Sequence, residues 1–236
     1  MTDIFREVEE EVRRERFEQL WKKYGDYIIA AAALIVVAVA AFELWRIYEK
    51  REALRASQVF NIAQQMLEQG QPKSAALTFS KLADTAPSGY SQIAMLDKAN
   101  ALYASGSVPQ AVDIYKQVAA KGDALLAPVA RVRAAWASVD TAPRADVEAL
   151  LQPLLDPATA WHPVAREILA YADYRAGDSE RALSEFRAIA NDPNSPETVR
   201  QRCKAMATFI SAGGNANFGS VPAPAKAAPA QGAKSQ

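Results

Sequence analysis

The sequence contains very few of the side chains from which most catalytic and metal sites are built. Its 236 residues include one histidine, His162, and one cysteine, Cys203. A disulfide within the chain is therefore impossible, and neither residue has a second ligand of its own kind for a zinc site. Phosphate-binding loops, dinucleotide-binding glycine motifs and the nucleophile or zinc motifs of hydrolases are also missing. We therefore expect a non-enzymatic protein that uses no cofactor and no metal; an enzyme with an unrecognised site at His162 or Cys203 is the alternative.

Net charge and strand-forming patterns are absent as well. Lys and Arg together number 27, as do Asp and Glu, so no net field attracts nucleic acid and we expect none to be bound. Residues 49–212 are rich in Ala, Leu, Glu, Gln, Arg and Lys, which favour helix, and show no strand-like alternation. This composition predicts an all-α domain. Residues 213–236 contain almost no large apolar side chain, and we expect this Ala/Pro/Gly tail to be disordered.

One long apolar run stands out against this composition, from Ile28 to Phe42, without a charge, a glycine or a proline. The segment from Tyr27 to Tyr48 has 22 residues, which at ~1.5 Å per residue gives ~33 Å of helix, enough to cross a bilayer. A soluble core helix would keep a polar stripe, and a signal peptide would have fewer charged residues before it. We therefore predict a single transmembrane helix at residues 27–48. Its membrane interface residues are Trp21, Tyr24, Trp45 and Tyr48.

Basic residues flank the predicted span on both sides. Five lie within 15 residues on the N-terminal side and four on the C-terminal side, which favours a cytoplasmic N-terminus. The N-terminal segment pairs Glu9 with Arg13 and Glu10 with Arg14 at helical spacing, and an apolar stripe on it leads into the span. This segment is either a plain extension of the span or a docking helix for cytoplasmic loops of a membrane partner. Residues 43–68 lack Gly and Pro, so we expect one long helix there.

The region between the span and the tail repeats itself. Three segments align without gaps from Gly70, Gly106 and Gly177; each has Ala five residues later, an aromatic four beyond that, then a branched apolar residue and a second Ala. This i, i+4, i+7 spacing makes one apolar helix face, and the leading Gly permits a tight turn. The second and third glycines are 71 residues apart, almost twice the 36 between the first two, so we expect a degenerate unit near residue 141. The repeated sets are Ala75, Phe79, Leu82 and Ala83; Ala111, Tyr115, Val118 and Ala119; Ala182, Phe186, Ile189 and Ala190; and, in the degenerate unit, Val147, Leu151 and Leu154.

A period of ~34–36 residues with two helices per unit is typical of a helical solenoid. The second-helix Ala, the aromatic residue four positions later and a closing proline, Pro87, resemble the tetratricopeptide repeat family. That family's small first-helix residue, twelve before the second-helix Ala, is matched by Ala63, Ala99, Ala135 and Ala170. The resemblance implies a tetratricopeptide-repeat-like α-solenoid. The predicted segments are a cytoplasmic amphipathic N-terminus (1–26), a transmembrane helix (27–48), the repeat domain (49–212) and the tail (213–236).

The order of these segments resembles a narrower group. Residues 3–210, with the opening DIFREVEEEVRRERFEQLWKKYGDYIIAAAALIVV, one span and degenerate repeats, are similar to the YfgM-like ancillary subunits of the SecYEG translocon. The resemblance implies a bacterial inner-membrane protein that crosses the membrane once, with a cytoplasmic N-terminus and a periplasmic repeat domain. It implies the translocon, a periplasmic chaperone or prolyl isomerase, and client polypeptides as partners. An assembly adaptor for another cell-envelope complex is the alternative.

Stacked hairpins curve, and we expect their first helices to line the concave face. Register places four residues at equivalent positions there, one after each small Ala, and a further set follows three positions later. Aromatic and amide side chains on a concave surface suit contact with extended peptides, although some of them could instead pack between hairpins. The candidate peptide-binding groove consists of Gln64, Asn100, Tyr103, Trp136, Tyr171 and Tyr174. The acidic residues Asp97, Asp113 and Glu185 are expected to be exposed.

Overall fold

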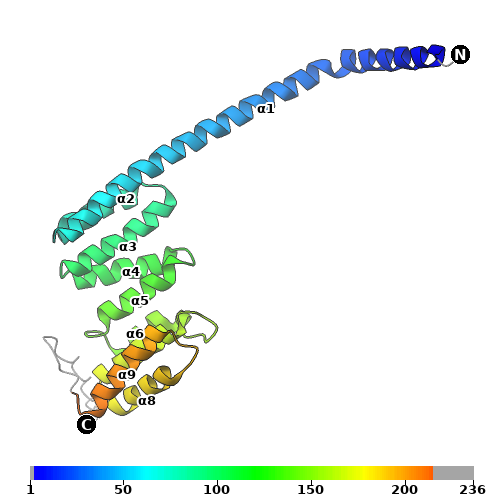
Figure 1. The fold of residues 1–236 in the computed structure, drawn as a ribbon. Helices are drawn as coiled ribbons and strands as arrows, with labels where there is room; N and C mark the ends of the chain where they lie inside the picture. Colours follow the sequence, from blue (N-terminus) through cyan, green and yellow to red (C-terminus); the bar gives the residue numbers. More distant parts are fainter. Residues whose placement is uncertain (1–2, 215–236) are drawn as a thin grey trace, which may run out of the picture. The chain divides into compact units, whose positions relative to one another are not determined.

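The computed structural model describes the backbone of residues 3–214 and, from residue 21 onward, every side chain in that range except those of Ile28, Ala32 and Ser88. Every regular element within residues 3–214 is a helix (Figure 1), which confirms the predicted all-α fold. The helices are α1 (Asp3–Glu68), α2 (Pro72–Thr85), α3 (Ser88–Ala104), α4 (Val108–Lys121), α5 (Leu126–Ser138), α6 (Arg144–Leu151), the 3₁₀ turn η1 (Gln152–Leu154), α7 (His162–Arg175), α8 (Ser179–Asn191) and α9 (Glu197–Ser211).

Helix α1 is uninterrupted. The prediction of one long helix over residues 43–68 is confirmed, since no glycine or proline ends it there. The chain divides into two compact units, Met1–Arg55 and Ala56–Gln236, so the last turns of α1 belong to the second unit. The charged pairs expected between residues 9 and 14 lie outside the described side chains, and the tail from residue 215 lies outside the described residues.

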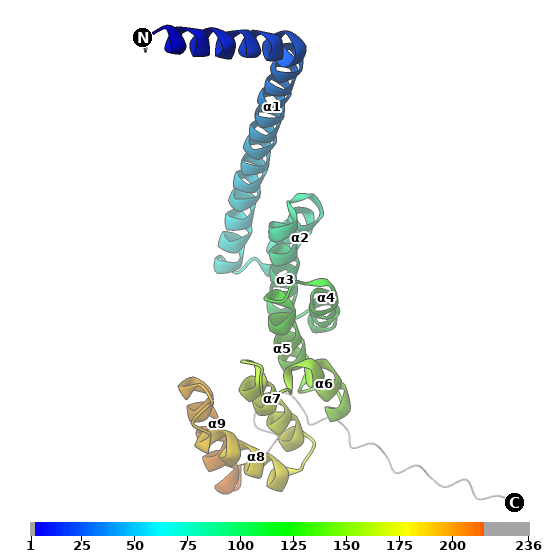
Figure 2. The ribbon, with the colours of Figure 1, turned by 90° about the vertical axis from the view of Figure 1, so that its right-hand side faces the viewer.

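The second unit is a series of helical hairpins. The last turns of α1 pack against α2, the hairpins α3–α4, α5–α6 and α7–α8 follow, and α9 packs on the last of them. Figures 1 and 2 show the hairpins following one another in sequence order, from the cyan end of α1 to the orange α9. The predicted tetratricopeptide-repeat-like solenoid is confirmed.

Glycine makes three of the four turns within the hairpins. Gly70, Gly106 and Gly177 have φ angles of +71°, +81° and +89°, which residues with a β-carbon rarely adopt. At each turn the glycine N–H donates to the carbonyl three residues back, and the next N–H donates to the carbonyl five residues before it, as Ser107 does to Leu102 at 2.9 Å. This is the Schellman motif, which satisfies the last carbonyls of the first helix. The predicted role of these glycines is confirmed.

The predicted apolar faces form the cores of the hairpins. All four first-helix alanines have no exposed surface, and the leading alanine and the aromatic ring of the second helices α2, α4 and α8 are likewise enclosed. Of the second alanines in these sets, Ala119 is buried, whereas Ala83 and Ala190 are only partly buried. A small Ala on each helix lets the two backbones approach, and the ring four residues on fills the space beside them. The buried members are Ala63, Ala99, Ala135 and Ala170 on the first helices, and Ala75, Phe79, Leu82, Ala111, Tyr115, Val118, Ala182, Phe186 and Ile189 on the second.

The degenerate unit has the expected register but a shorter second helix. Helix α6 ends at Leu151, and Pro153 then forces the 3₁₀ turn η1, because proline cannot donate the next helical hydrogen bond. Val147, Leu151 and Leu154 are nevertheless all buried in one cluster with Ala135. The second helix of the third hairpin is therefore shorter, with 8 residues against 13 or 14 in the other hairpins, while the same face remains in the core.

Candidate functional site

The first helices of successive hairpins carry a continuous set of polar contacts at the N-terminal end of the array. Gln64 in α1 donates from Nε2 to Oδ2 of Asp97 in α3 at 3.1 Å, and Asn100 donates from Nδ2 to Oδ1 of the same carboxylate at 2.6 Å. Register placed Gln64 and Asn100 at equivalent positions, and the structure brings both onto Asp97. The Asp97 side chain joins the first two hairpins across the predicted groove.

The same network continues into the third hairpin. The Oδ1 atom of Asn100 accepts from the Tyr115 hydroxyl at 2.6 Å and from Arg133 Nη1 at 2.7 Å. Burial raises the pKa of Asp97, although the Asn100 hydrogen bond and the Arg133 charge oppose this shift. Burial likewise raises the pKa of Tyr115. The arrangement fixes Asn100 and Arg133 in place, with the Arg133 side chain partly open to solvent.

Aromatic side chains continue the face on α5 and α7. The rings of Trp136 and Tyr171, again at equivalent positions, have centroids 5.7 Å apart, and 39% of Trp136 is exposed. The Tyr171 hydroxyl donates to Asp140 Oδ1 at 3.3 Å. Burial and the adjacent Asp140 carboxylate raise the pKa of Tyr171, so its hydroxyl keeps its proton at neutral pH.

Tyr103 and Tyr174 share one register position but have opposite surroundings. Tyr103 is 50% exposed, three residues after Asn100 and on the same face. Tyr174 is fully buried in the core of the last hairpin, and its hydroxyl donates to the Gly214 carbonyl at 3.0 Å. The assignment of Tyr174 to an open peptide-binding surface is therefore wrong, because α9 and the turn after it cover the position.

Of the three acidic residues expected to be exposed, one is exposed and two are partly buried. Asp113 is exposed, as expected. Asp97 is only partly exposed, since Gln64 and Asn100 cover it, and this expectation is corrected. Glu185 is half-buried and pairs with Arg166 at 2.7 Å. Sequence spacing contained one signal for Asp97, namely that it lies three residues before Asn100 on the same helix face.

Comparison with known proteins agrees with this geometry. The profile of the tetratricopeptide repeat-like domain matches residues 18–156, more than half of the chain. The chain belongs to the tetratricopeptide repeat-like domain family. Repeat folds of this family are typically non-catalytic scaffolds that bind other proteins. The matched range ends before α7, yet α7 and α8 continue the same register with Ala170 and Ala182 buried in one cluster.

Two further comparisons concern individual proteins. A crystal structure of nearly identical tetratricopeptide-like repeats from a putative kinesin light chain of Podosopora anserina is similar with a TM-score of 0.43 and 16% identity. The match covers 67% of this chain and 93% of that one. No curated protein matches the sequence.

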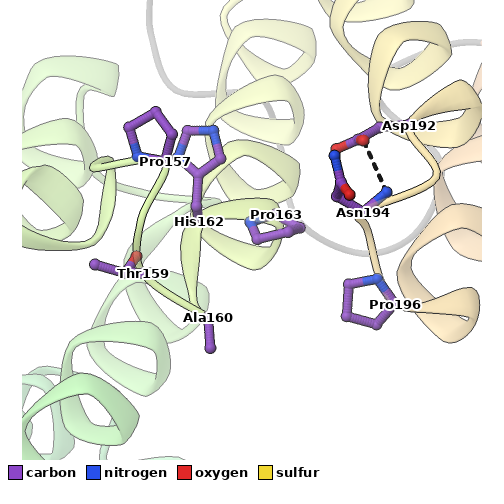
Figure 3. A pocket seen from close by; sticks show the side chains of 8 residues that line it. All are labelled: Pro157, Thr159, Ala160, His162, Pro163, Asp192, Asn194 and Pro196. Carbon is purple, nitrogen blue, oxygen red and sulfur yellow. Dashed lines mark hydrogen bonds between the residues drawn. The ribbon is translucent and has the colours of Figure 1, made fainter.

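The surroundings of His162 and Cys203, the two residues considered for enzymatic chemistry, follow from the positions of their helices α7 and α9. His162 begins α7 and lines a pocket with its neighbour Pro163 and with Pro157 and Pro196 from the loops before α7 and α9, and Figure 3 shows its ring beside Pro157 and apart from Asp192 and Asn194. Cys203 is fully buried in α9, and burial raises the pKa of its thiol to about 12. A thiol with this pKa is not a nucleophile at neutral pH. Among the described side chains of residues 21–214, no group of three His, Cys, Asp or Glu is placed to hold a metal.

The apolar run lies in the first unit and does not form a core. Helical residues from Trp21 to Glu68 include an 18-residue window long and apolar enough to cross a membrane, and none of that window is buried. A core helix of a soluble protein would be mostly buried, whereas a signal sequence would satisfy the same criteria of length and composition. The four predicted interface residues, Trp21, Tyr24, Trp45 and Tyr48, are all exposed, by 44–64%.

Proposed function

We propose that the protein is a single-pass inner-membrane scaffold whose repeat domain binds polypeptides in the periplasm. Residues 27–48 cross the membrane, residues 1–26 are cytoplasmic, and the repeats of 49–212 lie in the periplasm together with the segment 213–236 that follows them. The exposed apolar window supports the span, since such a surface needs a covering that the described chain does not supply. Flanking aromatic and basic residues support its position in the bilayer.

The observation that carries the binding proposal is the continuous face formed by Tyr103, Asn100, Arg133, Trp136 and Tyr171. It extends over α3, α5 and α7; hydrogen bonds hold Asn100 and Arg133, and ring contact holds Trp136 and Tyr171. The exposed rings of Tyr103 and Trp136 offer stacking surfaces, and the Arg133 guanidinium offers donors to peptide carbonyls. Because Asn100, Arg133, Trp136 and Tyr171 are already held by contacts within the chain, an extended polypeptide binds with less loss of side-chain entropy.

We infer further that this scaffold is held at the protein translocon, where it binds emerging clients or a periplasmic chaperone or prolyl isomerase. The resemblance of the N-terminal segment, span and repeats to the YfgM-like ancillary subunits supports this location. Tethering by one span raises the effective concentration of the groove at the exit site, so modest intrinsic affinity is sufficient. An adaptor for another envelope complex uses the same groove with a different neighbour.

A photocrosslinking experiment in spheroplasts tests both parts of the proposal. A photoreactive phenylalanine replaces Trp136 in the groove or, as a matched control, Asp113 on the exposed face of α4. Protease added to intact spheroplasts should digest the repeats, and the Trp136 position should crosslink to a translocating chain or a periplasmic folding factor while the Asp113 position does not. Protection of the repeats until lysis contradicts the topology. Crosslinks that are equal at both positions contradict the groove, and groove crosslinks to a different envelope complex support the adaptor.

A further inference from the structure

The hairpins stack through one recurring flank of each first helix. Lys98 in α3 donates from Nζ to Ser80 Oγ of the preceding second helix at 3.0 Å. Arg131 in α5 donates from Nη2 to the Ala119 carbonyl of its preceding second helix at 3.4 Å. In α7, Leu169 packs into the core of the third hairpin. This flank therefore contacts the previous hairpin in each of the three later repeats.

The same flank of the first hairpin is uncovered. Ile62 occupies the position equivalent to Lys98 one repeat earlier, and Val59 occupies the position equivalent to Arg131 two repeats earlier. Val59 is 37% exposed and Ile62 is 49% exposed, although their counterparts on α3 and α5 contact the previous hairpin. Met66 continues the stripe at helical spacing, and its Sδ accepts from Thr78 of α2 at 3.6 Å. Val59, Ile62, Met66 and Thr78 are called the open end below.

The other end of the array is closed differently. Helix α9 covers the last hairpin with Val199, Cys203, Ala207 and Ile210, which are all buried, and its outward residues are mostly polar and exposed. Solenoids need such capping elements, because an uncapped repeat leaves its stacking face in water. The chain has this element after the fourth hairpin, while the flank before the first hairpin remains apolar and exposed.

We propose that the open end binds an α-helix of a partner protein, which takes the place of a preceding second helix and extends the solenoid. The continuity of the stacking interface supports a helical occupant, since the exposed positions are those that receive a helix in the three later hairpins. Val59 and Ile62 are apolar where Arg131 and Lys98 stand in the inner repeats, and Leu169 of α7 is apolar at the position of Ile62, so the occupant needs an apolar stripe. Lys81, one turn after Thr78 on α2 and exposed, favours an acidic residue at the edge of that stripe. This inference depends on neither the groove nor the translocon.

Binding of a defined helix tests the inference directly. The probe is a fluorescein-labelled peptide of residues 106–122, which contains the second helix of the second hairpin and keeps its acidic Asp113, with a hydrocarbon staple replacing the exposed Lys116 and Ala120. The staple holds the helix, which would be marginal as a free peptide, and leaves its packing face unchanged. Fluorescence anisotropy with the full chain in detergent should show saturable binding. Ile62→Lys should weaken this binding by about tenfold or more, because a charge replaces the centre of the apolar stripe.

The controls separate this site from other surfaces. Leu125→Lys changes an apolar residue that is 79% exposed between α4 and α5, and should leave peptide binding unchanged. Trp136→Ala should also leave it unchanged, whereas it should abolish client binding in the groove. Val59→Lys should reproduce Ile62→Lys, and circular dichroism should show that both variants remain folded.

Four results would overturn the inference. One is an absence of saturable peptide binding by the wild-type chain. Another is an equal loss of binding in Leu125→Lys and Ile62→Lys. Light scattering that shows a dimer dissociated by Ile62→Lys would assign the open end to a second copy of this chain. Peptide binding that appears only after truncation at Gly214 would assign it to the chain's own tail.

Discussion

One ion pair ties α9 to the last hairpin, and its two partners should have unequal importance for stability. The carboxylate of Glu167 in α7 is only 5% exposed, whereas the side chain of its partner, Arg202 in α9, is 54% exposed. Arg202 donates from Nε to Oε1 at 2.7 Å and from Nη2 to Oε2 at 2.6 Å. Both oxygens of the buried carboxylate are therefore satisfied by one guanidinium.

The magnitudes follow from which partner remains buried. Arg202→Met keeps most of the apolar stem but leaves a buried carboxylate without its guanidinium. Breaking a fully buried pair in this way costs about 3–5 kcal/mol, and the exposure of Arg202 reduces our expectation to about 2–3 kcal/mol. In Glu167→Gln the arginine can turn to water, so the expected loss is about 1 kcal/mol. The double variant should lose less than the sum of the two, because no unpaired charge is buried.

Denaturant unfolding of the full chain in detergent, followed by far-ultraviolet circular dichroism, measures these differences. The matched control is Arg187→Met, since Arg187 also connects its helix to α9, through Ser211 Oγ at 3.1 Å, but is exposed. We expect this control to change the free energy of unfolding by less than about 0.5 kcal/mol. The reasoning is refuted if Arg202→Met is no more destabilising than the control, or if the double variant loses the full sum.

Three further predictions concern the turns, the thiol and the acidic network. Gly106→Ala should lower stability by about 1 kcal/mol in thermal unfolding, because its φ of +81° is strained for alanine although the space is open, whereas Gly89→Ala in α3 should be neutral or stabilising. Cys203, with its pKa raised to about 12, should resist alkylation by iodoacetamide at pH 8 in the folded chain and react after unfolding in urea. The raised pKa of Asp97 means that the folded state holds this proton more tightly than the unfolded state, so its destabilising contribution at neutral pH should fade as the pH is lowered from above the raised pKa towards about 4. Asp97→Asn should flatten that part of the stability–pH profile, and a profile identical to wild type would contradict the burial argument.

The features that depend on neighbouring residues in the chain were predictable from the sequence. A glycine such as Gly106 at the end of a helix is a local signal, because few other residues adopt the left-handed turn. The alanine and ring that follow, Ala111 and Tyr115, share a helix face by spacing alone, and both are buried. The degenerate third hairpin keeps the same spacing of buried residues, since Val147 and Leu151 occupy the expected face.

The polar network was not predictable in the same way. Asp97 contacts Gln64, which is 33 residues distant, and Asn100 contacts Arg133 at the same separation. Spacing near one repeat length indicates that these positions recur, but it does not say which side chains reach one another across the helices. A charged residue on a helix is usually solvated, so Asp97 was expected to be exposed until a neighbouring helix was placed beside it.

The contrast between Tyr103 and Tyr174 shows why register alone does not define a binding surface. Both follow the small first-helix alanine by four residues, and both were expected to face the groove. Tyr103 is followed by further hairpins that leave its face uncovered, whereas Tyr174 lies in the last hairpin, where α9 packs over the array and the Gly214 carbonyl accepts its hydroxyl. The same sequence position is therefore a surface residue inside the array and a core residue at its capped end. Position along the array decides between these roles. Val59 and Ile62 lie on the first hairpin, where no earlier hairpin packs on them, and they are therefore exposed.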